Sequence, residues 1–125
     1  WKRAFKYYKS YRMKKLQNLI IKDTNTFNKA VKKLKKKYIH IENDYMNFVN
    51  TIETIEDLGT NLWNNIYKVR IKNSDKNSGK SSGYRLISHL KLIENELYLM
   101  FIYDKSEIEN INEKEIDTFI LELSK

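Results

Sequence analysis

Residues 84–103, YRLISHLKLIENELYLMFIY, predict two strands joined by a short polar turn. Over residues 84–93, leucines alternate with charged and polar side chains, which indicates a strand with one buried face and one polar face. Residues 97–103 are apolar throughout, as expected of a central strand that is covered on both faces. Because the turn at residues 94–96 is short, we expect the two strands to pair antiparallel.

Residues 62–72 show the same period of two and predict a preceding strand. Its two sides differ in charge: Trp63, Tyr67, Val69 and Ile71 lie on one side, and Ile66, Lys68, Arg70 and Lys72 on the other. A polar connection, residues 73–83, leads to the strand that begins at Tyr84. Strands in consecutive order with such connections predict an antiparallel meander.

Helical periodicity dominates the region before these strands, after a short apolar run at residues 19–21 that predicts a first strand. Residues 23–25 offer three possible N-caps for the helix that follows. Apolar residues recur at helical spacing over residues 27–38 and again over residues 41–55, which predicts two helices. Gly59 then stops or redirects the chain.

A third helix is predicted towards residue 125. Asn112 and Glu115 form a capping-box-like pair, and Ile111 and Ile116 are spaced as a hydrophobic staple. Apolar residues then continue at helical spacing to Leu123. The element order β-α-α-β-β-β-α predicts an α+β domain, in which a twisted antiparallel sheet of about four strands packs with two N-terminal helices and one C-terminal helix.

The composition is compatible with one packed domain. The chain has 125 residues, of which 41% are hydrophobic, and its formal net charge is +8. It contains no cysteine, so we expect neither disulfides nor a thiolate metal site, in keeping with a reducing cytoplasm. No run of about 18 apolar residues occurs, and we therefore expect no membrane span.

Residues 1–12, WKRAFKYYKSYR, form a basic aromatic leader with five basic residues and no acidic one. One interpretation is a non-native or upstream extension in front of an ordinary start at Met13. The other is a basic amphipathic helix that binds RNA or an anionic surface. Without the leader, the net charge falls from +8 to +3 (8 − 5). We expect a single domain over residues 13–125.

Several classes of catalytic motif are missing from the sequence. Gly79-Lys80-Ser81 lacks the first glycine of a Walker A motif, and no GxSxG or HExxH pattern occurs. His40 is a lone histidine beside Tyr38, which is more typical of a surface or core residue than of a metal ligand. The sequence therefore predicts no nucleotide-binding loop, no metal site and no cofactor.

A set of cations on two neighbouring strands remains. By strand parity, Lys68, Arg70 and Lys72 share one face, and Arg85, His89 and Lys91 share a face of the next strand. If these strands pair through residues 73–83, the two rows adjoin. Like charges opposite each other are destabilising, so the functional interpretation is a cationic floor for a phosphodiester backbone. The alternative is a solvated polar face.

Such a floor suits RNA cleavage by attack of a 2′-hydroxyl on the adjacent phosphate. That reaction needs a base for the hydroxyl proton, stabilisation of charge on the phosphorane and an acid for the leaving 5′-oxygen. Arginine suits the phosphorane because its planar fork is always charged and binds two oxygens. A lysine crowded by other cations can serve as the base, and this scheme requires no metal.

Three segments together resemble the RelE/HigB family of bacterial toxins. They are IYKVR at residues 66–70, GKSSGYRL at residues 79–86, and YDKSE at residues 103–107 followed by Asn110-Ile111. A preceding Asp57-Leu58-Gly59 makes the resemblance closest to the HigB branch. The resemblance implies a compact toxin fold and a cytoplasmic endoribonuclease that cuts mRNA in the A site of the 30S ribosomal subunit. It also implies neutralisation by a helix-turn-helix antitoxin of the HigA type.

The same resemblance suggests roles for individual residues. Lys68 and Arg70 match strand cations that contact RNA and assist catalysis, Arg85 matches an arginine that stabilises the phosphate, and Lys105 matches a basic residue after the last strand. Further RNA contacts are expected from Lys72, Lys80, Lys91 and Tyr84.

One departure from the family pattern leaves the base open. RelE carries a tyrosine near its C-terminus, and this chain has no tyrosine after Tyr103. His89 or Lys68 are the candidates for the base. Two other functions also stay open at this stage: a ParE-like poison of DNA gyrase, and a non-catalytic relic that binds RNA or a partner.

Overall fold

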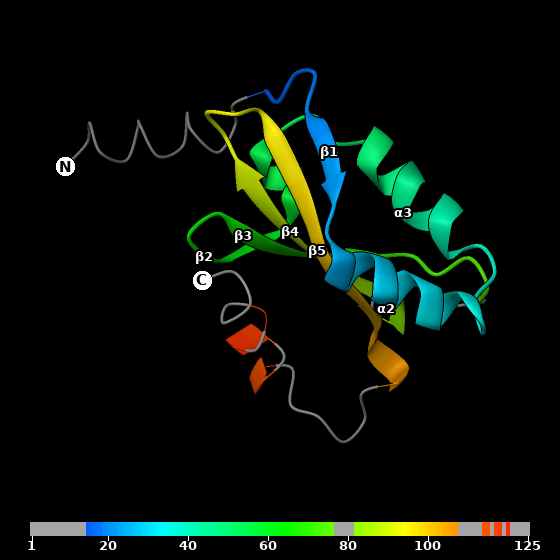
Figure 1. The fold of residues 1–125 in the computed structure, drawn as a ribbon. Helices are drawn as coiled ribbons and strands as arrows, with labels where there is room; N and C mark the ends of the chain where they lie inside the picture. Colours follow the sequence, from blue (N-terminus) through cyan, green and yellow to red (C-terminus); the bar gives the residue numbers. More distant parts are fainter. Residues whose placement is uncertain (1–14, 77–81, 108–113, 116, 119, 121–125) are drawn as a thin grey trace.

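A computed structural model of the chain describes residues 15–76 and 82–107, together with residues 114, 115, 117, 118 and 120 (Figure 1). The strands are β1 (Ile20–Asp23), β2 (Thr60–Trp63), β3 (Ile66–Ile71), β4 (Tyr84–Lys91) and β5 (Glu96–Asp104). The helices are α2 (Asn25–Lys35), α3 (Ile41–Asn50) and two short 3-10 turns, η1 (Ile55–Leu58) and η3 (Lys105–Glu107). Within these ranges, none of the helices has the length and apolar composition that a membrane crossing requires.

The five strands form one sheet in the order β1-β5-β4-β3-β2. Strands β3, β4 and β5 are an antiparallel meander, as predicted, and β2 extends it by one antiparallel strand. The α+β class is confirmed. The prediction of a wholly antiparallel sheet of about four strands was wrong, because β1 pairs with β5 in parallel. The chain crosses one face of the sheet through α2 and α3 after β1, which lets β1 and β5 run in the same direction (Figure 1).

The segment predicted as one strand over residues 62–72 is a hairpin in the structure. Strand β2 ends at Trp63, and the chain turns through Asn64 and Asn65, whose φ angles are 49° and 63°. Asparagine tolerates this left-handed conformation, and two such residues form the tight turn that suits a twisted hairpin. The Asn65 carbonyl also accepts a hydrogen bond from Leu90 N at 2.9 Å, which ties the turn to β4. Trp63 is therefore exposed on an edge strand instead of lying on a buried face.

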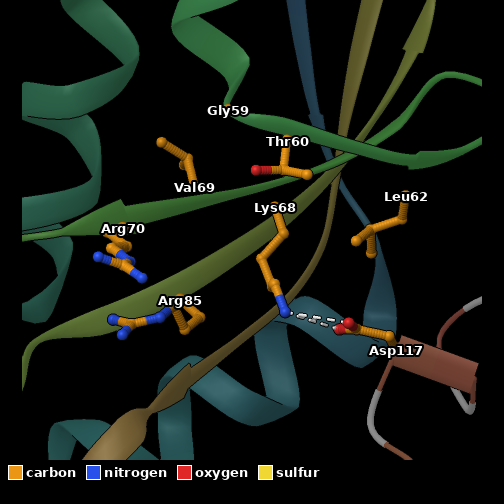
Figure 2. Close-up of a pocket in the computed structure, with 8 residues that line it drawn as sticks. All are labelled: Gly59, Thr60, Leu62, Lys68, Val69, Arg70, Arg85 and Asp117. Carbon is orange, nitrogen blue, oxygen red and sulfur yellow. Dashed lines mark hydrogen bonds and ion pairs between the residues drawn. The ribbon is translucent and has the colours of Figure 1, made fainter. Parts of the chain in front are cut away.

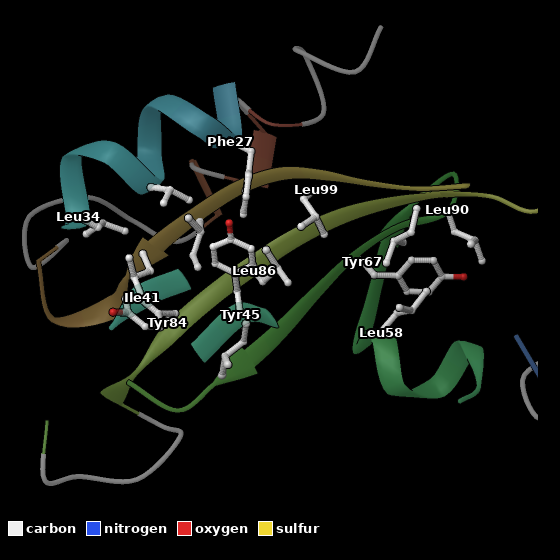
Figure 3. Close-up of a cluster of buried hydrophobic side chains, with 14 of the residues drawn as sticks. Phe27, Leu34, Ile41, Tyr45, Leu58, Tyr67, Tyr84, Leu86, Leu90 and Leu99 are labelled. Atoms are coloured by element: carbon white, nitrogen blue, oxygen red, sulfur yellow. The ribbon is translucent and has the colours of Figure 1, made fainter. Parts of the chain in front are cut away.

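The main core lies between the sheet and the two helices (Figure 3). Phe27 of α2 and Tyr45 of α3 meet edge to face with ring centroids 5.0 Å apart. Thr24 caps α2 by accepting a hydrogen bond from Phe27 N at 3.2 Å, and its own hydroxyl donates to Leu99 O of β5 at 2.9 Å. The helix start is thus bound directly to the central strand.

The opposite face of the sheet carries a smaller cluster that includes Ile66, Ile87 and Tyr103. Ile120 joins this cluster and is fully buried. Residues 114, 115, 117, 118 and 120 are helical, in agreement with the predicted C-terminal helix. The predicted cap at Asn112, its staple at Ile111 and Ile116, and the stripe residues Phe119 and Leu123 lie outside the described residues.

Gly59 fixes where β2 begins beside β3. Its φ is +97°, and a Cβ at this position would lie 2.2 Å from the carbonyl oxygen of Lys68. Both the backbone conformation and the close approach of β3 therefore require glycine. The turn before it is held by Asp57, whose carboxylate accepts hydrogen bonds from the backbone of Glu53 and Thr54.

Replacing Gly59 with alanine is expected to lower the free energy of unfolding by about 3 kcal/mol, because the new methyl group forces β2 away from Lys68. Urea unfolding followed by circular dichroism measures this change. The control is Glu56→Ala, an exposed position in η1, for which we expect a change within about 0.5 kcal/mol. A Gly59→Ala variant as stable as this control would contradict the assignment.

Candidate active site

The register between β3 and β4 brings the predicted cations together. Arg70 lies directly opposite Arg85, and Lys68 lies opposite Ile87. Since alternate residues of a strand share a face, all three cations lie on the side away from α2 and α3. The prediction that the two cationic rows adjoin is therefore confirmed for Lys68, Arg70 and Arg85.

These three side chains line one pocket of about 550 Å³ (Figure 2). The rest of its lining comes from the start of β2, from β3 and from the C-terminal segment: Gly59, Thr60, Leu62, Val69 and Asp117. Arg70 is exposed at the rim, whereas Arg85 is only 2% exposed. A guanidinium group held in the floor of a pocket needs little rearrangement to meet an anion, and its charge is less screened there than on the surface.

Asp117 is a charged residue of the pocket lining that the sequence did not predict. Lys68 Nζ donates hydrogen bonds to both of its carboxylate oxygens, at 3.0 and 3.2 Å. Both side chains are largely buried, with exposed fractions of 17% and 19%. No local sequence pattern predicts this ion pair, because its two residues lie 49 positions apart in the sequence.

Two of the other predicted residues on β4 lie away from this pocket. His89 is opposite Ile66 and partly buried, on the same face as Lys68 but outside the pocket lining. Burial and the nearby Lys91 both lower its pKa, which favours the neutral imidazole. Lys91 is exposed at the far end of β4, where it lies opposite Glu96 and 4.8 Å from the ring centroid of Tyr98.

Tyr84 is not available for RNA binding, so that prediction was wrong. Its side chain is fully buried on the helical face of the sheet, where it packs edge to face with Tyr38 at a centroid distance of 6.0 Å. Burial raises the pKa of its hydroxyl. Neighbouring residues on a strand point to opposite faces, so the position that places Arg85 in the pocket turns Tyr84 into the core.

The remaining predicted contacts lie near the connection between β3 and β4. Lys72 is exposed just beyond β3, and Lys105 is exposed in η3, where its backbone N–H donates to Gly83 O at 3.1 Å. Lys80 lies outside the described residues. Neither Lys72 nor Lys105 belongs to the pocket lining.

A buried carboxylate, Asp104, organises this connection. It accepts hydrogen bonds from Asn73 Nδ2 at 3.0 Å, from Ser106 N at 3.0 Å and from Lys76 Nζ. Lys76 Nζ also donates to Ser82 O at 3.2 Å, so both described ends of the connection are tied to the end of β5. Burial alone would raise the pKa of Asp104, but the hydrogen bonds from Lys76, Ser106 and Asn73 outweigh it and lower the pKa.

Helix α3 holds the same connection from the other side. His40 binds Asp75 twice, through Nδ1 at 2.7 Å and through a backbone N–H that donates at 3.1 Å. The contact raises the pKa of His40 and lowers that of Asp75. Asp44 accepts hydrogen bonds from the backbone and hydroxyl of Ser74. His40 is thus a surface residue that fixes a loop, and among the described residues no group of three metal-ligating side chains gathers.

Residues 21–125 match the family model of the RelE toxin of the RelE/RelB toxin–antitoxin system. The match covers the sheet, both helices and all the residues of the pocket. No curated protein sequence matches the chain.

Replacing Asp104 with asparagine is expected to lower the free energy of unfolding at pH 7 by about 3 kcal/mol, because the buried end of Lys76 loses its ionic partner. The folded-state pKa of Asp104 lies below its reference value of 3.8. The stabilisation is therefore present above pH 3.8 and disappears as the pH falls through the folded value. Urea unfolding of both proteins across the acid range tests this. A stability difference that does not shrink in acid would contradict it, and Glu94→Gln, at an exposed turn position, serves as the control.

Replacing Arg70 with glutamine is expected to raise the free energy of unfolding by about 0.5 kcal/mol, since it removes a like charge directly opposite Arg85. Thermal unfolding measures the change. The matched control is Lys72→Gln, which removes one cation from an exposed position beyond the β3–β4 pairing. If both variants change stability equally, the two arginines do not repel each other across the strands.

Proposed function

The chain belongs to the RelE toxin family, the toxins of toxin–antitoxin systems, and we propose that it is an endoribonuclease that cleaves mRNA in the ribosomal A site. The observation that carries the proposal is the pocket in which Lys68, Arg70 and Arg85 converge. A phosphodiester is the anion that such a site fits best, because two guanidinium groups can bind its non-bridging oxygens in pairs.

The arrangement also favours cleavage over simple binding. In the attack of a 2′-hydroxyl on phosphorus, negative charge grows on the phosphorane oxygens in the transition state. A buried, fixed cation such as Arg85 stabilises that state more than the ground state, because little of its environment reorganises during the reaction. The products are a 2′,3′-cyclic phosphate on one fragment and a 5′-hydroxyl on the other.

The proposed contact with the ribosome rests on positive charge on the opposite side of the molecule. Helix α2 buries Phe27, Val31 and Leu34. The helix and its C-cap expose a row of lysines: Lys29, Lys32, Lys33, Lys35 and the C-cap residue Lys36. Such a surface suits the backbone of a large structured RNA, while the pocket on the other face receives the strand to be cut. The antitoxin of the system is the protein partner, and we propose a helix-turn-helix protein of the HigA type in the cytoplasm.

Expression of the full chain in cells is expected to produce new mRNA 5′ ends within codons and to arrest growth, and Arg85→Ala is expected to lower cleavage at least about 100-fold. Mapping of mRNA 5′ ends after induction measures this. Lys22→Ala, an exposed cation on β1 at the far edge of the sheet, should cleave like the wild type.

A second variant keeps this test decisive if Arg85→Ala fails to fold. Arg70→Ala changes an exposed side chain in the same pocket and should also slow cleavage while the protein stays folded, as a cooperative thermal unfolding transition shows. Growth arrest with intact mRNA would overturn the nuclease proposal and indicate a gyrase poison. An absence of growth arrest would indicate a non-catalytic relic.

A further inference from the structure

The carboxylate of Asp117 is held in a fixed position in the pocket. Ile120, three residues further along, is fully buried against Ile66 and Ile87, so the segment that carries Asp117 is anchored to the sheet. The two hydrogen bonds from Lys68 Nζ then fix the direction of the carboxylate (Figure 2). Its position follows from packing on one side and from an ion pair on the other.

Binding of RNA does not explain an acid at this place. A carboxylate repels the phosphate that Lys68, Arg70 and Arg85 would attract. A carboxylate is, however, a proton acceptor, and the reaction requires one near the attacking hydroxyl. An acid in a phosphate pocket is therefore understandable when its role is to accept a proton.

The other candidate bases fit less well. Lys68 donates both of its described hydrogen bonds to Asp117, so its nitrogen acts as a donor in this arrangement. His89 lies on the same face but does not line the pocket. Among the described lining residues, Asp117 is the carboxylate and the natural acceptor.

We propose that Asp117 is the general base of the site and that Lys68 is its paired acid. This inference rests on the proposed ribonuclease function. The carboxylate takes the proton of the 2′-hydroxyl, the 2′-oxygen forms its bond to phosphorus, and the bond from phosphorus to the 5′-oxygen breaks. The Lys68 ammonium gives its proton to the leaving 5′-oxygen. Asp117 then returns its proton to Lys68 through the existing hydrogen bond, which restores the pair for the next turnover.

The charged groups around Asp117 come from two strands. Lys68 and Arg70 face it from β3, Arg85 faces it from β4, and Tyr103 of β5 lies on the same face of the sheet. The lining residues from β2, Thr60 and Leu62, carry no charge. The carboxylate therefore lies among cations, and Lys68 is the one whose contact with it fixes its direction.

The test compares Asp117→Asn with the wild type on ribosomes programmed with an mRNA of known A-site codon. We expect cleavage to fall at least about 100-fold. Binding to ribosomes whose A-site codon carries 2′-deoxy sugars, which cannot be cut, should be equal to or tighter than that of the wild type. The matched control is Glu115→Gln, an exposed acid on the same segment, and thermal unfolding checks that each variant is folded.

Each outcome of this test supports or overturns the role of Asp117 as the general base. Slow cleavage with retained binding supports the base. Cleavage by Asp117→Asn at the wild-type rate or faster overturns it and makes the contact a brake on the site. Loss of binding together with cleavage also overturns it, because Asp117 would then support the fold of the pocket. If the wild type itself fails to cleave, the proposed ribonuclease function falls first. If the wild type cleaves and Arg85→Ala does not, that function stands whatever Asp117→Asn does.

Discussion

The register between β3 and β4 is the constraint on which the rest of this structure depends. It places Arg70 against Arg85 on one face and Val69 against Leu86 on the other. Because side chains alternate along a strand, a slip of one residue would move the arginines into the core and the apolar residues into the pocket. The pairing of β3 with β4 therefore positions both the hydrophobic core and the cationic pocket, and a change of its register would disrupt both.

Several local features hold that pairing in place. The Asn64–Asn65 turn fixes one end of the hairpin, and Gly59 lets β2 approach Lys68 closely. At the other end, Asp104 ties the connection before β4 to the end of β5. The Asn64–Asn65 turn and Asp104 lie outside the pocket lining, whereas Gly59 contributes to it. The protein therefore positions its cations through backbone contacts and the ion pair of a buried carboxylate. The repulsion between the arginines is a local penalty that this surrounding framework outweighs.

The sequence predicted the parts of the fold that have a strong period. Alternation over residues 84–103 identified β4 and β5, and strand parity placed Lys68, Arg70 and Arg85 on adjoining rows of one face. The same parity would have excluded Tyr84, which follows the opposite alternation to Arg85. The hairpin turn was missed because apolar residues keep the same alternation on both sides of Asn64 and Asn65, at Trp63 and Tyr67. The parallel pairing of β1 was missed because no local pattern records which strand a short apolar run will join. Asp117 was missed for a related reason, since its contact depends on how a distant helix packs.

The division of the pocket between the sheet and a later segment has a consequence for the order in which the protein is made. Synthesis runs from the N-terminus, so the strands that carry Lys68, Arg70 and Arg85 are made before the segment that carries Asp117 and Ile120. The cations come from the sheet, whereas the carboxylate arrives only when that later segment packs on the sheet through Ile120. Completion of the pocket is therefore a late step of folding, which depends on the last segment that joins the sheet.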